Sequence, residues 1–263
     1  MTGTVVLAGF AFCVSLLTLF TGFGLGTLLM PAFALFLPMQ VAVASTALVH
    51  AANNLFKVGL LAGDAHRGVI LRFGLPAVVA AFAGAWLLST LSSQTPLLDW
   101  EILGRSARVT PVKLVMGVLI LGFSLFELVP KLRDARAPAR WLPLGGALSG
   151  FFGGLSGHQG ALRAAFLSPL GLSPTRFAAT QAVLALLVDG ARLLVYGWSF
   201  ALLRDAPEAQ AVPWRLVATT TAAAFAGAFL GKRLLHKTTM GGLRRLVGGL
   251  LLIVGTALAT GIA

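Results

Sequence analysis

Apolar residues fill this chain in long runs that only short polar links separate. Crossing a ~30 Å hydrocarbon core as a helix takes roughly 17 to 25 mostly apolar residues. Eight stretches meet this need: residues 5–37, 41–62, 69–91, 112–129, 142–170, 175–197, 215–235 and 243–262. Their apolar positions do not alternate with a period of two, as the strands of a barrel do. The pattern therefore predicts an all-α polytopic membrane protein.

The first and fifth stretches are too long for a single crossing, and glycines interrupt both. One cluster is Phe20-Thr-Gly-Phe-Gly-Leu-Gly26, and the other is Phe152-Gly-Gly-Leu-Ser-Gly-His-Gln-Gly160. Glycine loses the most backbone entropy in a helix and has no side chain to shield its peptide groups from lipid. We therefore predict two broken helices whose exposed backbone groups face something other than lipid.

The second half of the chain repeats the first, and several similarities occur in the same order. They are Ala80–Leu87 with Ala223–Leu230, Leu114–Gly117 with Leu246–Gly249, and the equal spacing of Gly26 to Thr46 and Gly160 to Thr180. Three matches in one order favour a duplication over chance. The predicted domains are a first transmembrane repeat at 1–130, a basic cytoplasmic linker at 131–140 and a second repeat at 141–263.

Charge indicates how the two halves are oriented. The net charge is +12, but most Lys and Arg residues lie in the links, where they set topology, so we predict no nucleic-acid binding. Links after the second and seventh stretches and at the midpoint are strongly basic, whereas acids balance those after the third and sixth. With the basic links cytoplasmic, equivalent links fall on opposite sides. This predicts inverted-topology repeats, each with a glycine-broken re-entrant or hairpin first segment followed by three transmembrane helices, and both termini periplasmic.

Polar side chains gather beside the two glycine clusters. Ionisable groups inside a membrane are costly and indicate function with a named partner. The candidate substrate-binding residues are Gly22, Gly24, Gly26, Thr46, His50, Asn53, Asn54, Lys57, Ser156, Gly157, His158, Gln159, Gly160, Arg163, Thr180 and Gln181. Asp189 and Arg192, three residues apart, form either a proton-coupling or a structural pair.

The balance of embedded charge predicts the sign of the solute. Lys57, Arg163 and Arg192 outnumber Asp189, and two half-helix N-termini add positive dipole ends, so the pathway should favour an anion. Structural alternatives are snorkelling for Lys57 and close helix packing for the small-residue motifs, such as Gly150-xxx-Gly154. The single Cys and scattered His residues support no metal site, and we expect no cofactor.

An enzyme is the main alternative class. Gly154-Leu-Ser156-Gly157 fits the Gly-x-Ser-Gly motif of rhomboid intramembrane serine proteases, and His50-xxx-Asn54 fits their oxyanion-side pattern. A serine nucleophile needs a histidine base within hydrogen-bond reach. The late candidate, His236, lies in a basic link and lacks the small-residue setting of that base. A protease also has no use for a duplicated inverted scaffold, so we predict a protein that is not an enzyme.

The duplicated halves resemble the sulfite exporter TauE/SafE family of membrane transporters over nearly the whole chain. Each half opens with a glycine-rich break followed by a proline, Pro31 or Pro169, and the stretch from Gly150 to Arg163 is the most specific match. In the first break, Phe23 and Leu25 interrupt the family's more continuous glycine run.

The resemblance implies a secondary transporter of sulfite, organosulfonates or related organic acids across a bacterial inner membrane. Alternating access at a midplane site is the mechanism we expect, with an anion channel as the alternative. A proton coupled through Asp189 or His158 is a further hypothesis. The expected partners are thus a small anionic substrate, the lipid bilayer and coupled protons.

Overall fold

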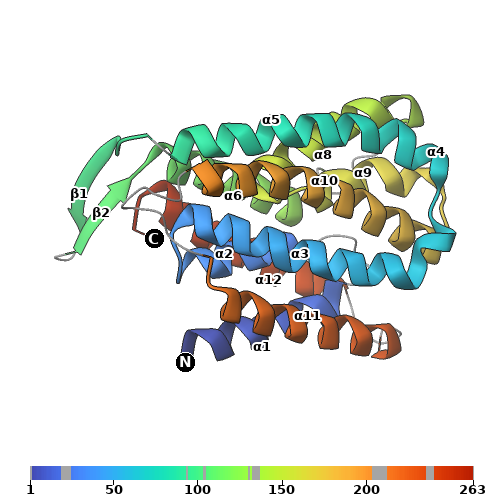
Figure 1. Ribbon diagram of the computed structural model, residues 1–263, viewed down its shortest axis with the longest axis horizontal. Coiled ribbons are helices and arrows are strands. Elements are labelled where there is room, and N and C mark those ends of the chain that lie inside the picture. Colours follow the sequence, from blue (N-terminus) through green and yellow to red (C-terminus); the bar gives the residue numbers. More distant parts are fainter. Residues whose placement is uncertain are drawn as a thin grey trace.

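Helices account for most of the described chain, as the apolar pattern predicts (Figure 1). The computed structural model describes residues 2–18, 25–92, 94–102, 105–129, 131, 137–202, 212–234 and 240–262. The first predicted stretch contains two helices, α1 (Thr2–Thr18) and α2 (Leu25–Ala34). Residues 19–24, with Gly22 and Gly24, lie outside the described residues.

The fifth stretch also divides into two helices, α8 (Leu142–Ser156) and α9 (Gly160–Leu167). Gly157 ends α8 with a φ of 82°, in the left-handed region that glycine adopts without strain. A Cβ at this position would also lie 2.8 Å from Nη1 of Arg192. The predicted glycine break is therefore confirmed here, and the backbone conformation favours glycine, while a larger residue would also have to displace Arg192.

The remaining helices follow the other predicted stretches to within a few residues, except that α10 extends further. The long ones are α3 (Met39–Leu61), α5 (Leu75–Ser92), α6 (Pro111–Leu128), α10 (Pro174–Leu202), α11 (Trp214–Leu234) and α12 (Met240–Ala259). Short turns are η1 (Ala62–Asp64), α4 (Arg67–Val69), the π-helical η2 (Ile70–Gly74), η3 (Ala139–Trp141) and η4 (Ser168–Leu170).

Each broken segment turns back toward the end from which it started. A Cβ on Gly3, in the first turn of α1, would lie 3.3 Å from the ring of Phe36, just after α2. Leu142 at the start of α8 and Leu170 after α9 line one cavity of about 350 Å³, together with Val69 of α4. Both segments are thus hairpins of two helices rather than single crossings.

Glycines bring the main helix pairs into close contact. On α8, Gly146, Gly150 and Gly154 lie directly against the backbone carbonyls of Phe73, Ala77 and Ala81, so that any Cβ would overlap them. Because both series advance along the chain in the same direction, α8 runs parallel to the helix formed by η2 and α5. The small-residue motif in this segment therefore packs helices together.

The α5–α8 pair has a further contact of this kind, and the pair formed by α1 and α11 has an equivalent one. Gly84 of α5 lies against the carbonyl of Phe151 on α8, and Gly227 of α11 lies against the carbonyl of Phe12 on α1. Gly84 and Gly227 hold equivalent positions in the two similar sequence segments. Helices α6 and α12 pair antiparallel, with the Ser124 hydroxyl donating to the Gly248 carbonyl at 2.8 Å.

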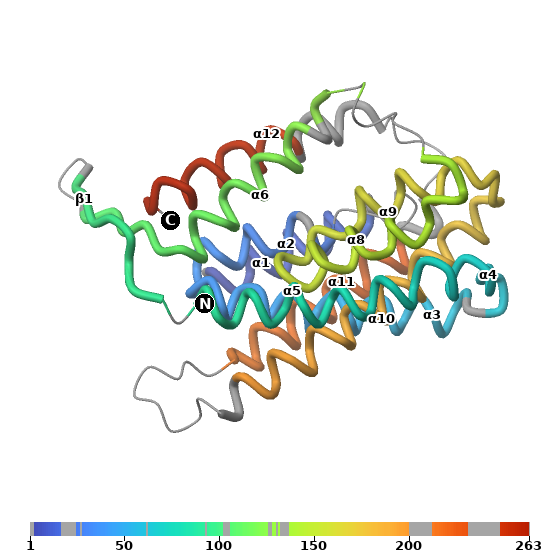
Figure 2. The backbone as a smooth tube through the Cα atoms, turned by 90° about the horizontal axis from the view of Figure 1, so that it is seen from above, coloured from blue at the N-terminus to red at the C-terminus, as the bar shows by residue number. Residues whose placement is uncertain are grey.

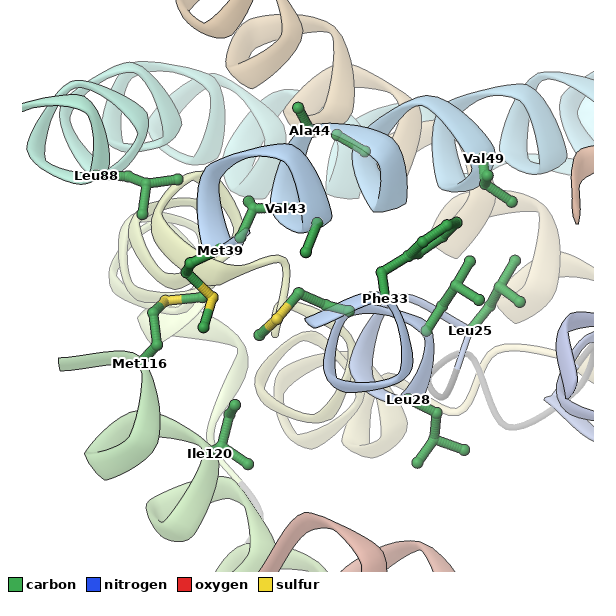
Figure 3. Packing of buried hydrophobic residues seen from close by; sticks show 14 of the residues in the cluster. Leu25, Leu28, Phe33, Met39, Val43, Ala44, Val49, Leu88, Met116 and Ile120 are labelled. Carbon is green, nitrogen blue, oxygen red and sulfur yellow. The ribbon is translucent and has the colours of Figure 1, made fainter. Parts of the chain in front are cut away.

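The apolar core surrounds α2. Leu29, Met30 and Phe33 are fully buried there, and they pack with residues of α3, α5, α6 and α12. Figure 3 shows Met39 of α3 and Met116 of α6 pointing toward one another beside this helix. The second half of the first hairpin is therefore enclosed by protein.

Two short strands correct the all-α prediction. Strands β1 (Leu98–Ile102) and β2 (Arg105–Val109) form an antiparallel hairpin in which Asp99 pairs with Arg108 across the strands. The indole of Trp100 donates to the Thr260 carbonyl at 2.8 Å, which fixes the hairpin to the end of α12. A pair of five-residue strands in a polar link gives too short an alternation to outweigh the helical pattern around it.

The outer surface of the bundle is apolar. Val79, Leu194 and Ile253 are 72%, 68% and 68% exposed, as expected of side chains that face lipid. Within the described residues, the helices at Arg67–Ser92 and Pro174–Ser199 are long and apolar enough to cross a membrane, each with 26 residues. The predicted number of crossings stays a prediction.

Both ends of the chain lie at one end of the molecule. Figures 1 and 2 place both chain termini at the same end of the long axis as the β-hairpin, and α4 at the opposite end. The links at the α4 end carry Arg67, Arg72 and Arg140. At the hairpin end, by contrast, Asp99 and Glu101 partly balance Arg105 and Arg108.

Candidate functional site

A buried carboxylate, Asp189 of α10, is the centre of the polar interior. Its side chain is fully buried and accepts hydrogen bonds from four residues. Oδ1 accepts from Nε and Nη2 of Arg192 at 3.0 and 2.7 Å and from Nε2 of Gln159 at 3.3 Å. Oδ2 lies 2.8 Å from Nδ1 of His50 and accepts from the Asn54 amide at 3.0 Å.

Arg163 of α9 extends this network. Its side chain is 2% exposed, and Nη1 donates to Oε1 of Gln159 at 2.9 Å. Nε donates to the amide oxygen of Gln181 on α10. Gln159 therefore links the Arg163 guanidinium to the Asp189 carboxylate, since its amide accepts from one and donates to the other.

The break in the second hairpin holds these groups in place. The last carbonyls of a helix have no partner within it. Arg192 reaches the Gly153 carbonyl at 3.5 Å, and the hydroxyl of Tyr196 donates to the Gly154 carbonyl. The Ser149 hydroxyl donates to the Gln159 carbonyl at 3.0 Å, which ties the chain after the break back to α8.

The two broken segments meet beside this network. A Cβ on Gly26, in the first turn of α2, would lie 3.2 Å from the Gly157 carbonyl and 3.4 Å from Nε2 of His50. The N-terminus of α2 thus adjoins the break between α8 and α9. We call the place where Gly26, His50 and Gly157 come together the seam.

Positive charge exceeds negative charge around the seam. Asp189 is the one acidic side chain among the buried residues that the structure describes, whereas Arg163 and Arg192 are both buried. Lys57, half-buried on α3, lies close enough to Arg163 for their charges to interact. Burying excess charge is costly unless an opposite charge or several hydrogen bonds compensate for it.

Several predicted site residues use their polar atoms elsewhere. The hydroxyl of Thr46 donates to the Ala42 carbonyl, and that of Thr180 donates to the Arg176 carbonyl and accepts from the backbone of His66. Both amide atoms of Asn53 are buried and have no hydrogen-bond partner among the described residues.

Ser156 and His158 lie at the break itself. The Ser156 hydroxyl donates to the Phe152 carbonyl at 3.0 Å, and Nδ1 of His158 is 3.1 Å from the same hydroxyl oxygen. The His158 ring stacks on Phe123 of α6, with centroids 5.2 Å apart. Gly160 begins α9 immediately after the break.

Sequence reasoning did not single out Ser149 and Tyr196, which hold the break from two sides. Tyr196 is the chain's single tyrosine and stands seven residues after Asp189, two helical turns along the same face. That spacing, in an otherwise apolar stretch, is the signal that could have indicated it.

An apolar helical bundle that encloses a positively charged junction of broken helices defines the class of polytopic membrane proteins that handle small solutes. Comparison with protein families makes this more specific. Residues 7–258 match the family model described as Sulfite exporter TauE/SafE. The chain therefore belongs to the TauE/SafE sulfite exporter family of membrane transporters. No curated protein and no solved structure matched the chain.

Proposed function

We propose that this protein is a secondary transporter that moves a small anion across the bacterial inner membrane by alternating access. The substrate class is sulfite, an organosulfonate or a related organic acid. The observation that carries the proposal is the excess of cations, the buried Arg163 and Arg192 and the half-buried Lys57, beside the place where the two broken segments meet. An anion in the seam would offset that charge.

Backbone geometry supports an anion as the ligand. The helix α2 begins at Leu25 and α9 begins at Gly160, and both N-termini adjoin the seam. Helix N-termini carry partial positive charge and free amide donors, as in transporters with discontinuous helices. Asn53 adds a buried amide with hydrogen-bonding capacity to spare among the described residues.

The packing also favours two inverted repeats as the moving parts. The hairpin of α1 and α2 opens toward the end with the chain termini, and the hairpin of α8 and α9 opens toward the α4 end. The contact of α8 with α5 has its equivalent in the contact of α1 with α11, because α1 corresponds to α8 and α11 corresponds to α5 in the two halves of the sequence. Such pseudo-symmetry lets a scaffold adopt two equivalent conformations around one site, one open to each side of the membrane.

A binding screen tests the proposal. Purified protein is heated with sulfite, thiosulfate, sulfoacetate, taurine or simple carboxylates, and a bound ligand raises the apparent Tm. We expect at least one sulfur oxyanion to stabilise the wild type, and Arg163→Gln to weaken its binding about tenfold or more, since a charge-assisted hydrogen bond is lost. Arg176→Gln, on an exposed position of α10, is the matched control. Unchanged affinity in Arg163→Gln would contradict the assignment.

Transport by vesicles distinguishes a carrier from a channel. Vesicles that contain the reconstituted protein and unlabelled anion should transiently accumulate labelled anion from outside. The reason is that a carrier exchanges one internal anion for one external anion in each cycle. A continuously open pore gives no such counterflow. The absence of counterflow together with anion binding would favour the channel.

A further inference from the structure

The His50 side chain is held by Asp189 through Nδ1, and its other ring nitrogen, Nε2, lies 3.4 Å from the amide nitrogen of Asn54. Nδ1 lies 2.8 Å from Oδ2 of Asp189, a fully buried carboxylate that accepts from Arg192, Gln159 and Asn54 as well. So many donors favour the ionised carboxylate, which can only accept. The proton of the neutral imidazole therefore resides on Nδ1, and Nε2 keeps its lone pair.

The second ring nitrogen lies at the seam. Nε2 is 3.4 Å from the position that a Cβ on Gly26 would occupy, and the Gly157 carbonyl is 3.2 Å from that same position. The His50 side chain is 12% exposed, whereas that of Asp189 is fully enclosed. The ring is thus less enclosed than its carboxylate partner, and its Nε2 adjoins Gly26 of the first hairpin.

We propose that Nε2 of His50 binds a proton together with the anion, so that this protein moves its substrate in symport with a proton. The inference rests on the proposed function and names the coupling ion and its binding atom. A proton on Nε2 creates an N–H donor with positive charge at the seam, aimed where an anion oxygen would bind. Loss of that proton removes both the donor and the charge.

The groups around His50 explain why the proton and the anion depend on each other. Arg192 on α10 and Lys57 on the same helix as His50 carry positive charges that act on the ring, and Arg163 on α9 acts on Asp189 and Lys57. Asp189 is the one buried acid among the residues that the structure describes. Without a ligand, the cations oppose a further positive charge on the ring. An anion in the seam offsets them, and by linkage each ligand then strengthens binding of the other.

The geometry assigns the proton to His50 rather than to the Asp189 carboxylate. Protonating Asp189 would turn one acceptor oxygen into a donor facing Arg192, Gln159 or Asn54, all of which donate to it. Asp189 is therefore a positioning residue, and it fixes the tautomer and the orientation of the imidazole.

Nitrogen NMR of the full-length protein in lipid nanodiscs tests the arrangement directly. The chain contains four histidines, so ¹⁵N-histidine labelling gives few signals, and His50→Gln identifies the one from His50. We expect its neutral form to carry the proton on Nδ1 and to take up the second proton on Nε2. A neutral ring protonated on Nε2 would overturn the proposal.

Binding measurements test the coupling. Thiosulfate suits this test because it stays fully ionised from about pH 5 to about pH 8; any other anion found in the screen replaces it if thiosulfate does not bind. In the wild type, the affinity for thiosulfate should fall about tenfold for each unit by which the pH rises once His50 is deprotonated. Binding of thiosulfate should then be accompanied by the uptake of a proton from a weak buffer. His50→Gln should bind more weakly with a flat pH profile. His66→Asn, outside the seam, should retain the slope.

The outcomes separate the two proposals. If the wild type binds an anion with no pH dependence and no proton uptake, the coupling is wrong and the transporter assignment stands. If no anion in the screen binds to the wild type, the proposed function fails and the coupling fails with it. A pH slope that persists in His50→Gln would move the proton to another residue and overturn the assignment to His50.

Discussion

Asp189 has more protein partners than any other site residue described above. Its carboxylate forms an ion pair with Arg192 of α10 and contacts one histidine and two amides. These three side chains belong to α3 and to the break before α9. Its negative charge keeps Arg192 in the interior, where an isolated guanidinium would be strongly unfavourable. At the scale of single residues, this pair sets both the charge of the site and the orientation of His50.

Replacing Asp189 by Asn should destabilise the protein strongly. Arg192 is fully buried, and leaving such a cation unpaired costs about 3 to 5 kcal/mol. We expect a clear fall in the apparent Tm in detergent, and a smaller fall in the double variant Asp189→Asn with Arg192→Gln, because the second change removes the uncompensated charge.

The chain provides a matched control for this comparison. Asp99 and Arg108 also form an ion pair, 2.9 Å between Nε and Oδ1, but their side chains are 62% and 65% exposed. Asp99→Asn should leave the apparent Tm nearly unchanged, since exposed pairs contribute little. Equal effects at Asp99 and Asp189 would show that burial is not the source of the cost.

At the scale of elements, glycine has two separate uses in the second hairpin. Gly157 turns the chain with a positive φ, whereas Gly150 and Gly154 let α8 approach α5 until backbone meets backbone. The sequence pattern presents both as a single glycine-rich cluster. The helix contacts distinguish a residue needed for the break from residues needed for packing.

Gly150→Ala should therefore loosen the α5–α8 pair. The added methyl would overlap the Ala77 carbonyl, and overpacking of this kind costs about 1 to 3 kcal/mol. We expect a lower apparent Tm that anion binding restores in part. Gly122→Ala in α6, where a Cβ would meet nothing within 4 Å, is the control and should not lower the Tm, since alanine is the better helix former.

At the scale of the whole molecule, the α4 end and the hairpin end differ in charge. The α4 end carries the basic links, and the hairpin end carries both chain termini. Because positive links stay in the cytoplasm, we predict that the termini and the β-hairpin are periplasmic.

Cysteine labelling tests this orientation. In a Cys13→Ser background, a cysteine at the exposed Glu101 of the hairpin should react with a membrane-impermeant maleimide in intact spheroplasts. A cysteine at Arg140, exposed at the other end, should react only after lysis. The reverse pattern would invert the topology without altering the fold.

The sequence by itself determined the membrane class, the positions of most helices, the break near Gly157 and an interior with more cations than acids. These features depend on the length of apolar runs and on glycine content, which are local properties. It also supplied the candidate site residues, among them His50, Arg163 and Asp189, since ionisable groups stand out in apolar stretches.

Only the tertiary structure decided which of these residues act together. His50 and Asp189 are 139 positions apart, and no local pattern indicates that they form a pair. The structure also assigns the hydroxyls of Thr46 and Thr180 to backbone carbonyls and reveals the hairpin held by Trp100. The physical reason is that partners in a network are selected by the packing of distant helices, whereas the sequence pattern reports only each helix's own preference for lipid or protein.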